Sequence, residues 1–190
     1  IDLFPTENLT DFTKAFTSAI MGQLDSSPAQ ILNTAFSIFK GFRPYATVDA
    51  ISGQPKIGLD IVPGTEEATL EQVFSYLEKY KGHCYIALDE FQQVAYYPEQ
   101  NIEALLRSFI QDMHGTHFIF SGSHEHMVGE MFHSPKRPFY QSTTEKNIGV
   151  IENVPYFSFA SQFFSKQDRQ LPKEVFDKVY YRYDGYTWYI

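Results

Sequence analysis

The sequence predicts an α/β fold: a three-layer αβα arrangement in which helices cover both faces of a parallel β-sheet, with an inserted β-hairpin. Residues 84–88 and 117–121 are short, almost wholly apolar runs, as expected of strands buried on both faces. Between them, residues 102–113 carry apolar side chains at helical spacing. A strand–helix–strand order of this kind predicts two parallel strands joined by a crossover helix.

The other elements follow from the same periodicities and from turn residues. Apolar residues recur every three or four positions in the helical stretches, and Pro28 and Gly41 are typical of a helix start and a helix end. In chain order, the sequence predicts a strand over 1–4, a helix that Thr6 caps and that runs to about Leu24, a helix over 27–41, a hairpin over about 43–62 with its turn at 52–55, a helix over 69–81 and a short helix over 124–132.

The C-terminal part has a different character. The apolar residues of 148–158 predict one more short strand, and the pattern is helical again from residue 159 onward. We therefore expect 1–158 to form the core domain and 159–190 to begin a helical appendage.

Composition excludes several classes of protein. A formal net charge of −8, with no basic stripe, disfavours nucleic-acid binding by this segment. No apolar run approaches the roughly 20 residues that span a bilayer, so no membrane partner is expected. The single cysteine, Cys84, falls inside an expected strand, which favours a reduced, cytoplasmic protein without disulfides.

The most informative motif is an acid pair that directly follows an apolar strand. Asp89 and Glu90 come at the end of the 84–88 run, and open parallel sheets bind ligands at the carboxyl ends of their strands. In nucleotide hydrolases one such acid holds Mg²⁺ and a second polarises the attacking water. The alternative interpretation is a pair of acids that caps the next helix or is simply solvated.

Two serines follow the second strand in the same way. Ser121 or Ser123 could hydrogen-bond a terminal phosphate or the attacking water, with Ser121 the preferred candidate. Alternatively, the serines belong to a polar strand-to-helix turn in which Ser123 caps the helix. Arg137 is a candidate for stabilising phosphate charge, although its place beside Lys136 favours a solvated loop arginine.

One component of a nucleotide site is missing from these 190 residues. A phosphate-binding loop of the form G-x-x-x-x-G-K-[S/T] holds phosphates through backbone N–H groups and a lysine, and no glycine of the chain stands in such an array. The histidines at 124 and 126 are two residues apart, which does not suit a zinc site on a helix.

Taken in order, these motifs resemble the archaeal-type ATPases of the AAA-like P-loop superfamily, and more closely their bacterial branch. The resemblance covers nearly the whole chain and is carried by Leu-Asp-Glu-Phe-Gln-Gln at 88–93, Asn-Ile-Glu-Ala-Leu-Leu-Arg at 101–107, Phe-Ile-Phe-Ser-Gly-Ser at 118–123, Ile-Asp-Leu-Phe-Pro-Thr at 1–6 and Gly-Tyr-Thr-Trp-Tyr at 185–189.

This resemblance implies a role for each motif. Asp89 and Glu90 match the Walker B acids, with Asp89 at Mg²⁺ and Glu90 catalytic, and Ser121 or Ser123 matches the sensor 1 position. The family's P-loop (Walker A) precedes the strand that residues 1–4 match, so the resemblance implies a fragment that starts after it. Residues from 159 onward match the start of a helical lid. Many relatives carry Gly-Arg where this chain has Gln141-Ser142, so no arginine role transfers there.

The functional expectation is therefore a fragment of an ATP-binding, Mg²⁺-dependent ATPase that is inactive as this isolated chain. A different class of function, a non-catalytic regulatory or protein-interaction scaffold, is the alternative, and the aromatic residues and the hairpin would supply its contact surface. What ATP hydrolysis would drive, whether the partner is a second copy or another protein, and the oligomeric state do not follow from the sequence.

Overall fold

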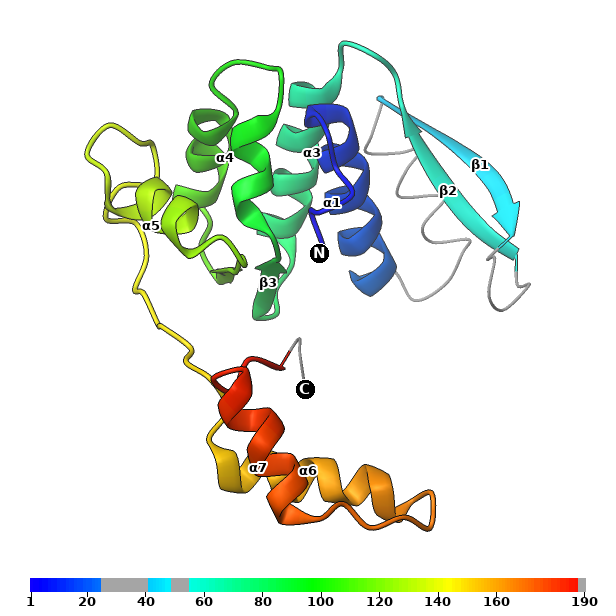
Figure 1. Cartoon of the computed structure of the whole chain (residues 1–190). Coiled ribbons are helices and arrows are strands. Elements are labelled where there is room, and N and C mark those ends of the chain that lie inside the picture. Colours follow the sequence, from blue (N-terminus) through cyan, green and yellow to red (C-terminus); the bar gives the residue numbers. More distant parts are fainter. Residues whose placement is uncertain (25–40, 49–54, 188–190) are drawn as a thin grey trace. The chain divides into compact units, whose positions relative to one another are not determined.

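The computed structural model describes residues 1–24, 41–48 and 55–187. The chain divides into two compact units, Ile1–Thr143 and Thr144–Ile190 (Figure 1). The boundary that the sequence predicts, between residues 158 and 159, stays a prediction.

The first unit contains a small parallel sheet. Strand β3, Cys84–Leu88, pairs in parallel with β4, Thr116–Phe120. The N-terminal segment pairs with the other side of β3 through a parallel bridge between Asp2 and Asp89. Leu3 N donates to Asp89 O at 3.0 Å, and Asp89 N donates to Ile1 O at 2.9 Å. The predicted parallel pairing is thus confirmed, and the strand predicted over 1–4 is present as a short bridge.

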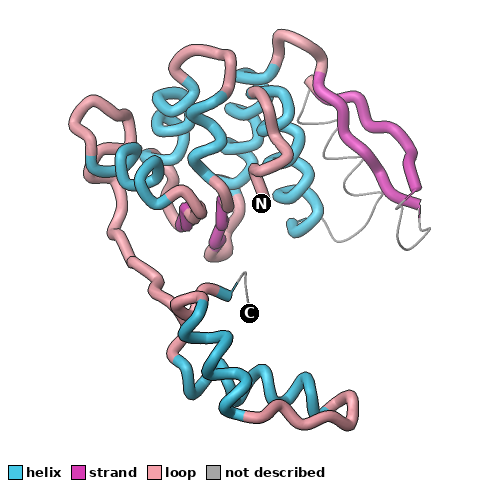
Figure 2. The backbone as a smooth tube through the Cα atoms, in the orientation of Figure 1, coloured by secondary structure: helices cyan, strands magenta, loops and turns pink. Residues whose placement is uncertain are grey.

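Helices form most of the first unit, as Figure 2 shows. They are α1 (Leu9–Leu24), α3 (Glu66–Lys79), the 3₁₀ helix η1 (Phe91–Tyr96), α4 (Ile102–Gln111) and α5 (Glu125–His133). The helices predicted over 69–81, 102–113 and 124–132 therefore form with ends that differ by a few residues, as is usual for helix termini.

The sheet has one covered and one exposed face. Ile86 and Leu88 are buried in a core that α1, α3, α4 and α5 share. Between them in sequence, Tyr85 is 69% exposed, and Ile119 on β4 is 53% exposed. Because alternate residues of a strand point to opposite faces, the described residues leave the second face open. The structure is therefore α/β, and the third layer of the predicted αβα arrangement stays a prediction.

Helix α1 packs as its periodicity predicts, but a different residue caps it. Phe12 and Phe16 are buried, and the Phe16 ring stacks on Phe74 of α3 with centroids 5.1 Å apart. The cap interaction comes from Asn8, whose Oδ1 accepts a hydrogen bond from Asp11 N at 2.9 Å. The predicted cap, Thr6, instead donates to Leu3 O at 2.5 Å, because it lies in the turn before the helix.

The inserted hairpin is confirmed. Strand β1, Phe42–Val48, pairs antiparallel with β2, Pro55–Ile61, and Phe42 lies opposite Ile61. Gly41 accepts a hydrogen bond from Val62 N at 2.8 Å and so extends the base of the hairpin. The helix predicted ahead of Gly41 and the predicted hairpin turn lie outside the described residues.

The second unit is a pair of helices with a small aromatic core. Helix α6 spans Asn153–Ser165 and α7 spans Lys173–Arg182. In the described part of this unit, the core consists of the buried side chains of Tyr156, Phe176 and Tyr180.

The strand predicted over 148–158 is wrong. Residues 148–152 have no regular secondary structure, and helix α6 begins at Asn153. Pro155 falls in the first turn of that helix, where a missing N–H costs nothing. Ile148 and Val150 are exposed and have no neighbouring strand to pair with among the described residues.

Removal of the Phe91 ring is expected to destabilise the first unit strongly. Phe91 is fully buried, and its ring packs against Phe120, Phe132 and Phe139 with centroids 4.5 to 5.9 Å apart. Phe91→Ala should lower the free energy of unfolding by about 3–5 kcal/mol in urea denaturation. Phe4→Ala, at an exposed position, is the control and should stay within about 0.5 kcal/mol of the parent. Equal losses in both variants would contradict this packing.

Candidate functional site

The acid pair and the serines come together because the two parallel strands end side by side. Ser121 N donates to Leu88 O at 3.0 Å, which extends the β3–β4 ladder by one step. Asp89 and Ser121 are the first residues beyond these strands. Ser121 Oγ donates to Asp89 Oδ1 at 2.6 Å, a short hydrogen bond of the kind that charged acceptors make. Asp89 Oδ1 also accepts from Glu90 N at 3.1 Å.

The second acid is held by the second serine and by a glutamine. Glu90 Oε2 accepts from Ser123 Oγ at 2.9 Å and from Ser123 N at 3.4 Å. The side-chain amide of Gln92 donates to the same oxygen. Each predicted acid is thus paired with one predicted serine, Asp89 with Ser121 and Glu90 with Ser123.

Glu90 adopts a backbone conformation that is uncommon for its residue type. Its φ of 54° and ψ of 43° lie in the left-handed region, at the turn from β3 into η1. Most other non-glycine residues of the described part with positive φ are Asn or Asp, whose short side chains tolerate it better. Backbone strain of this kind costs about 1–3 kcal/mol and persists where surrounding contacts fix it. Here Phe91 N donates to Ser121 O at 2.9 Å and fixes the turn.

Sequence reasoning missed Gln92 and the function of Gly122. Gln92 is 4% exposed, and its Oε1 has no hydrogen-bond partner among the described residues. A Cβ at position 122 would lie 2.1 Å from that Oε1 and 2.7 Å from Cγ2 of Val128. Glycine between the two serines therefore provides room for the glutamine. The available signal was a glutamine two residues after the acid pair, next to the apolar Phe91.

Arg137 makes its ion pairs away from the acid pair. Its Nη1 lies 2.7 Å from Glu103 Oε1 on α4, and its Nη2 lies 3.2 Å from Glu130 Oε1 on α5. Glu103 is buried, and its burial raises the pKa of its carboxyl above the usual value. The nearby Glu130 charge also raises this pKa, whereas the Arg137 charge lowers it. Arg137 thus joins two helices, and its catalytic role stays a prediction that these contacts do not support.

The donor atoms at the strand ends suit Mg²⁺ rather than a softer metal. Asp89 and Ser121 offer a carboxylate and a hydroxyl, the hard oxygen ligands that Mg²⁺ prefers. No group of three or more His, Cys, Asp or Glu side chains that could hold an ion occurs in the described part of the chain. Such a site fits an ion that completes its coordination with water and phosphate oxygens, as Mg²⁺ commonly does.

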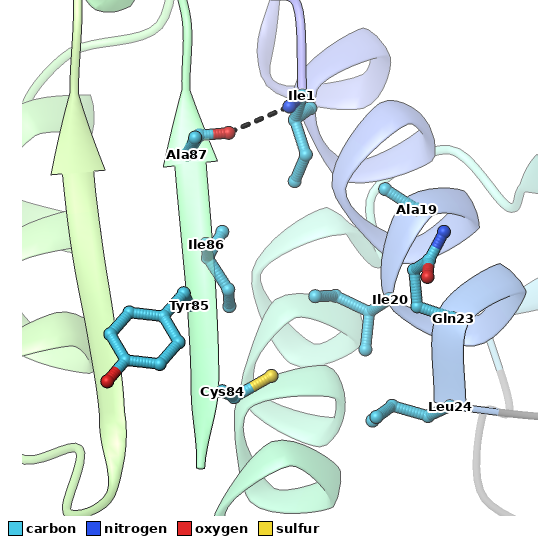
Figure 3. Close-up of a pocket in the computed structure, with 9 residues that line it drawn as sticks. All are labelled: Ile1, Ala19, Ile20, Gln23, Leu24, Cys84, Tyr85, Ile86 and Ala87. Atoms are coloured by element: carbon cyan, nitrogen blue, oxygen red, sulfur yellow. Dashed lines mark hydrogen bonds between the residues drawn. The ribbon is translucent and has the colours of Figure 1, made fainter.

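A pocket of about 280 Å³ lies at the other half of β3 (Figure 3). It is lined by Ile1, by residues Cys84–Ala87 of β3 and by the end of α1. The Ile1 amino group donates a hydrogen bond to Ala87 O at 2.7 Å. Neither acid nor either serine contributes to its lining. The acid pair lies at the carboxyl end of β3, separate from this pocket.

Comparison with known proteins adds one observation. No protein-family model and no curated protein matches the sequence. Among solved structures, a Walker-type ATPase of Pyrococcus abyssi is similar, with a TM-score of 0.56 and 15% sequence identity over 95% of this chain. The chain shares the fold of a Walker-type ATPase. It spans about half of the archaeal chain, 49% of its length.

Proposed function

We propose that the protein containing these residues binds and hydrolyses ATP with Mg²⁺, and that this chain supplies the acidic half of the site. The observation that carries the proposal is the pairing of Asp89 with Ser121 and of Glu90 with Ser123 at the ends of two parallel strands. This is the place where open parallel sheets bind ligands. The fold shared with a Walker-type ATPase supports the proposal.

Each side chain has a distinct role in this proposal. Mg²⁺, held by Asp89, would neutralise charge on the phosphates when bound. Glu90 orients a water molecule and accepts its proton. Ser121 fixes the Asp89 carboxylate and is our preferred sensor for the terminal phosphate, whereas Ser123 holds Glu90.

The phosphate-binding loop would come from outside these 190 residues. None of their glycines forms the required array, and the similar archaeal chain is about twice as long. Residues 144–190, with helices α6 and α7, would contribute the first part of a helical lid. None of the helices in the described segments has the length and apolar character to cross a membrane.

Dependence on metal tests this function. The full-length protein should hydrolyse ATP in Mg²⁺, measured by phosphate release, and should stop when EDTA removes the metal. Asp89→Asn should raise the Mg²⁺ concentration needed for half-maximal turnover. The 190-residue chain alone should show no micromolar Mg-ATP binding by calorimetry, because the phosphate loop is missing. Absence of hydrolysis by the full-length protein, or turnover that EDTA leaves intact, would rule the proposal out.

A non-catalytic scaffold is the second candidate. The open sheet face favours it, because the apolar side chains of Tyr85 and Ile119 are exposed there and could contact another protein. The two functions separate on one observation: a scaffold needs no phosphate-binding loop, so a full-length sequence without one favours the scaffold.

A further inference from the structure

The carboxylate of Glu90 is held through one oxygen only. Oε2 accepts from the Ser123 hydroxyl, the Ser123 backbone N–H and the Gln92 amide. Within the described residues, no group donates to Oε1. A carboxylate anchored in this way presents its second oxygen in one orientation, which is the arrangement that a general base requires.

Gln92 is the one of these donors that is rigidly enclosed. It lies in η1, where Phe91 and Val94 are also buried. Ser123, in contrast, lies in an exposed turn. Its Oε1 sits against Gly122, where even a methyl group would not fit. The amide therefore has little freedom to turn away from Glu90.

Core stability does not explain a glutamine at this position. A buried carbonyl oxygen without a partner costs about 1–3 kcal/mol, and the Gln92 Oε1 is in that situation. An apolar side chain of similar size would avoid this cost. The other end of the amide offsets this cost, because its NH₂ group donates a hydrogen bond to the Glu90 carboxylate.

We propose that Gln92 is a positioning residue that fixes Glu90 for the activation of water, with Gly122 providing the space that this requires. The inference rests on the proposed ATPase function and adds Gln92 to Ser123 as a group that holds Glu90. Gln92 acts through Glu90 and itself contacts no nucleotide.

Substitution of the two adjacent glutamines in the full-length protein tests the inference. Gln92→Leu should lower kcat by about 10- to 100-fold, the usual effect of losing a group that orients a catalytic ligand, with KM for ATP unchanged. Its melting temperature should not fall, because the unpaired carbonyl is removed. Gln93→Leu is the matched control: the Gln93 amide donates to Thr6 O at 3.0 Å, away from the acids, so kcat should be retained.

The outcomes separate the two proposals. If the parent hydrolyses ATP and Gln92→Leu retains its kcat, the positioning role is wrong and the ATPase function stands. A fall in kcat that matches a fall in melting temperature also overturns the positioning role. If the parent does not hydrolyse ATP, the function itself fails, and this role with it.

A nucleotide-free measurement checks the contact itself. In NMR spectra of the full-length protein, Glu90→Gln should shift the side-chain amide protons of Gln92 upfield, because a charged acceptor is replaced by a neutral one. The corresponding protons of Gln93 should not move. Unchanged Gln92 protons would overturn the proposed contact.

Discussion

Replacement of Glu90 by Gln in the full-length protein is expected to lower ATP turnover by about 10²- to 10⁴-fold, the contribution typical of a positioned general base. Glutamine has the same size and keeps an oxygen that can accept from Ser123, so the turn after β3 should be preserved. It cannot take a proton from water. Affinity for Mg-ATP should therefore remain, and single-turnover phosphate release together with calorimetry would measure both quantities.

Glu78→Gln is the matched control for this prediction. Glu78 is an exposed residue of α3, so the same chemical change there should leave turnover and affinity unaltered. Parental turnover in Glu90→Gln would show that another group activates the water, and that the contacts of Ser123 and Gln92 with Glu90 serve a different purpose.

Replacement of Arg137 by Met is expected to cost about 3 kcal/mol in the free energy of unfolding at neutral pH. Removal of one member of a buried ion pair leaves an uncompensated charge, which costs about 3–5 kcal/mol, and the partial exposure of Arg137 argues for the lower end. Met retains much of the aliphatic packing. Lys136→Met, at the exposed neighbouring residue, should have a small effect in the same denaturation experiment.

The pH dependence of this loss follows from Glu103. Its pKa is already raised by burial, and without the guanidinium it should rise further. The folded protein then holds a proton that the unfolded chain releases, so the free energy of unfolding falls as pH rises from the usual carboxyl value to the raised one. The deficit of Arg137→Met should therefore shrink toward about pH 4.

A second substitution separates structure from catalysis at this site. Glu103→Gln in the Arg137→Met protein removes the unpaired charge and should restore most of the lost stability. If Arg137→Met were as stable as Lys136→Met but no longer hydrolysed ATP, Arg137 would act on phosphate instead.

Much of the fold could be predicted from the sequence because periodicity reports burial directly. The apolar runs that end at Leu88 and Phe120 and the helical face from Ile102 onward all correspond to elements in the structure. The acid pair could be found because its position is set by the end of a strand. Its pairing with Ser121 and Ser123 follows once the strands are parallel and adjacent.

The features that the sequence could not provide depend on contacts between residues that lie far apart in the chain. The 148–158 region has the apolar content of a strand, yet a strand needs a neighbour, and none is present among the described residues. Arg137 looks like a free loop cation until α4 and α5 bring two carboxylates to it. The fit of Gln92 against Gly122 depends on ångström-scale packing, which composition does not encode.

The pairing of the N-terminal segment with β3 has a consequence for how the site is assembled during folding. The Ile1 amino group reaches Ala87, 86 residues away in the chain, whereas helices α3 and α4 form from local contacts. Closing loops of that length is slow relative to helix formation. The strained turn at Glu90 can persist only after its surroundings are in place. The acid pair should therefore reach its final geometry late, and a chain arrested early would contain its helices but no organised pair of carboxylates at the end of β3.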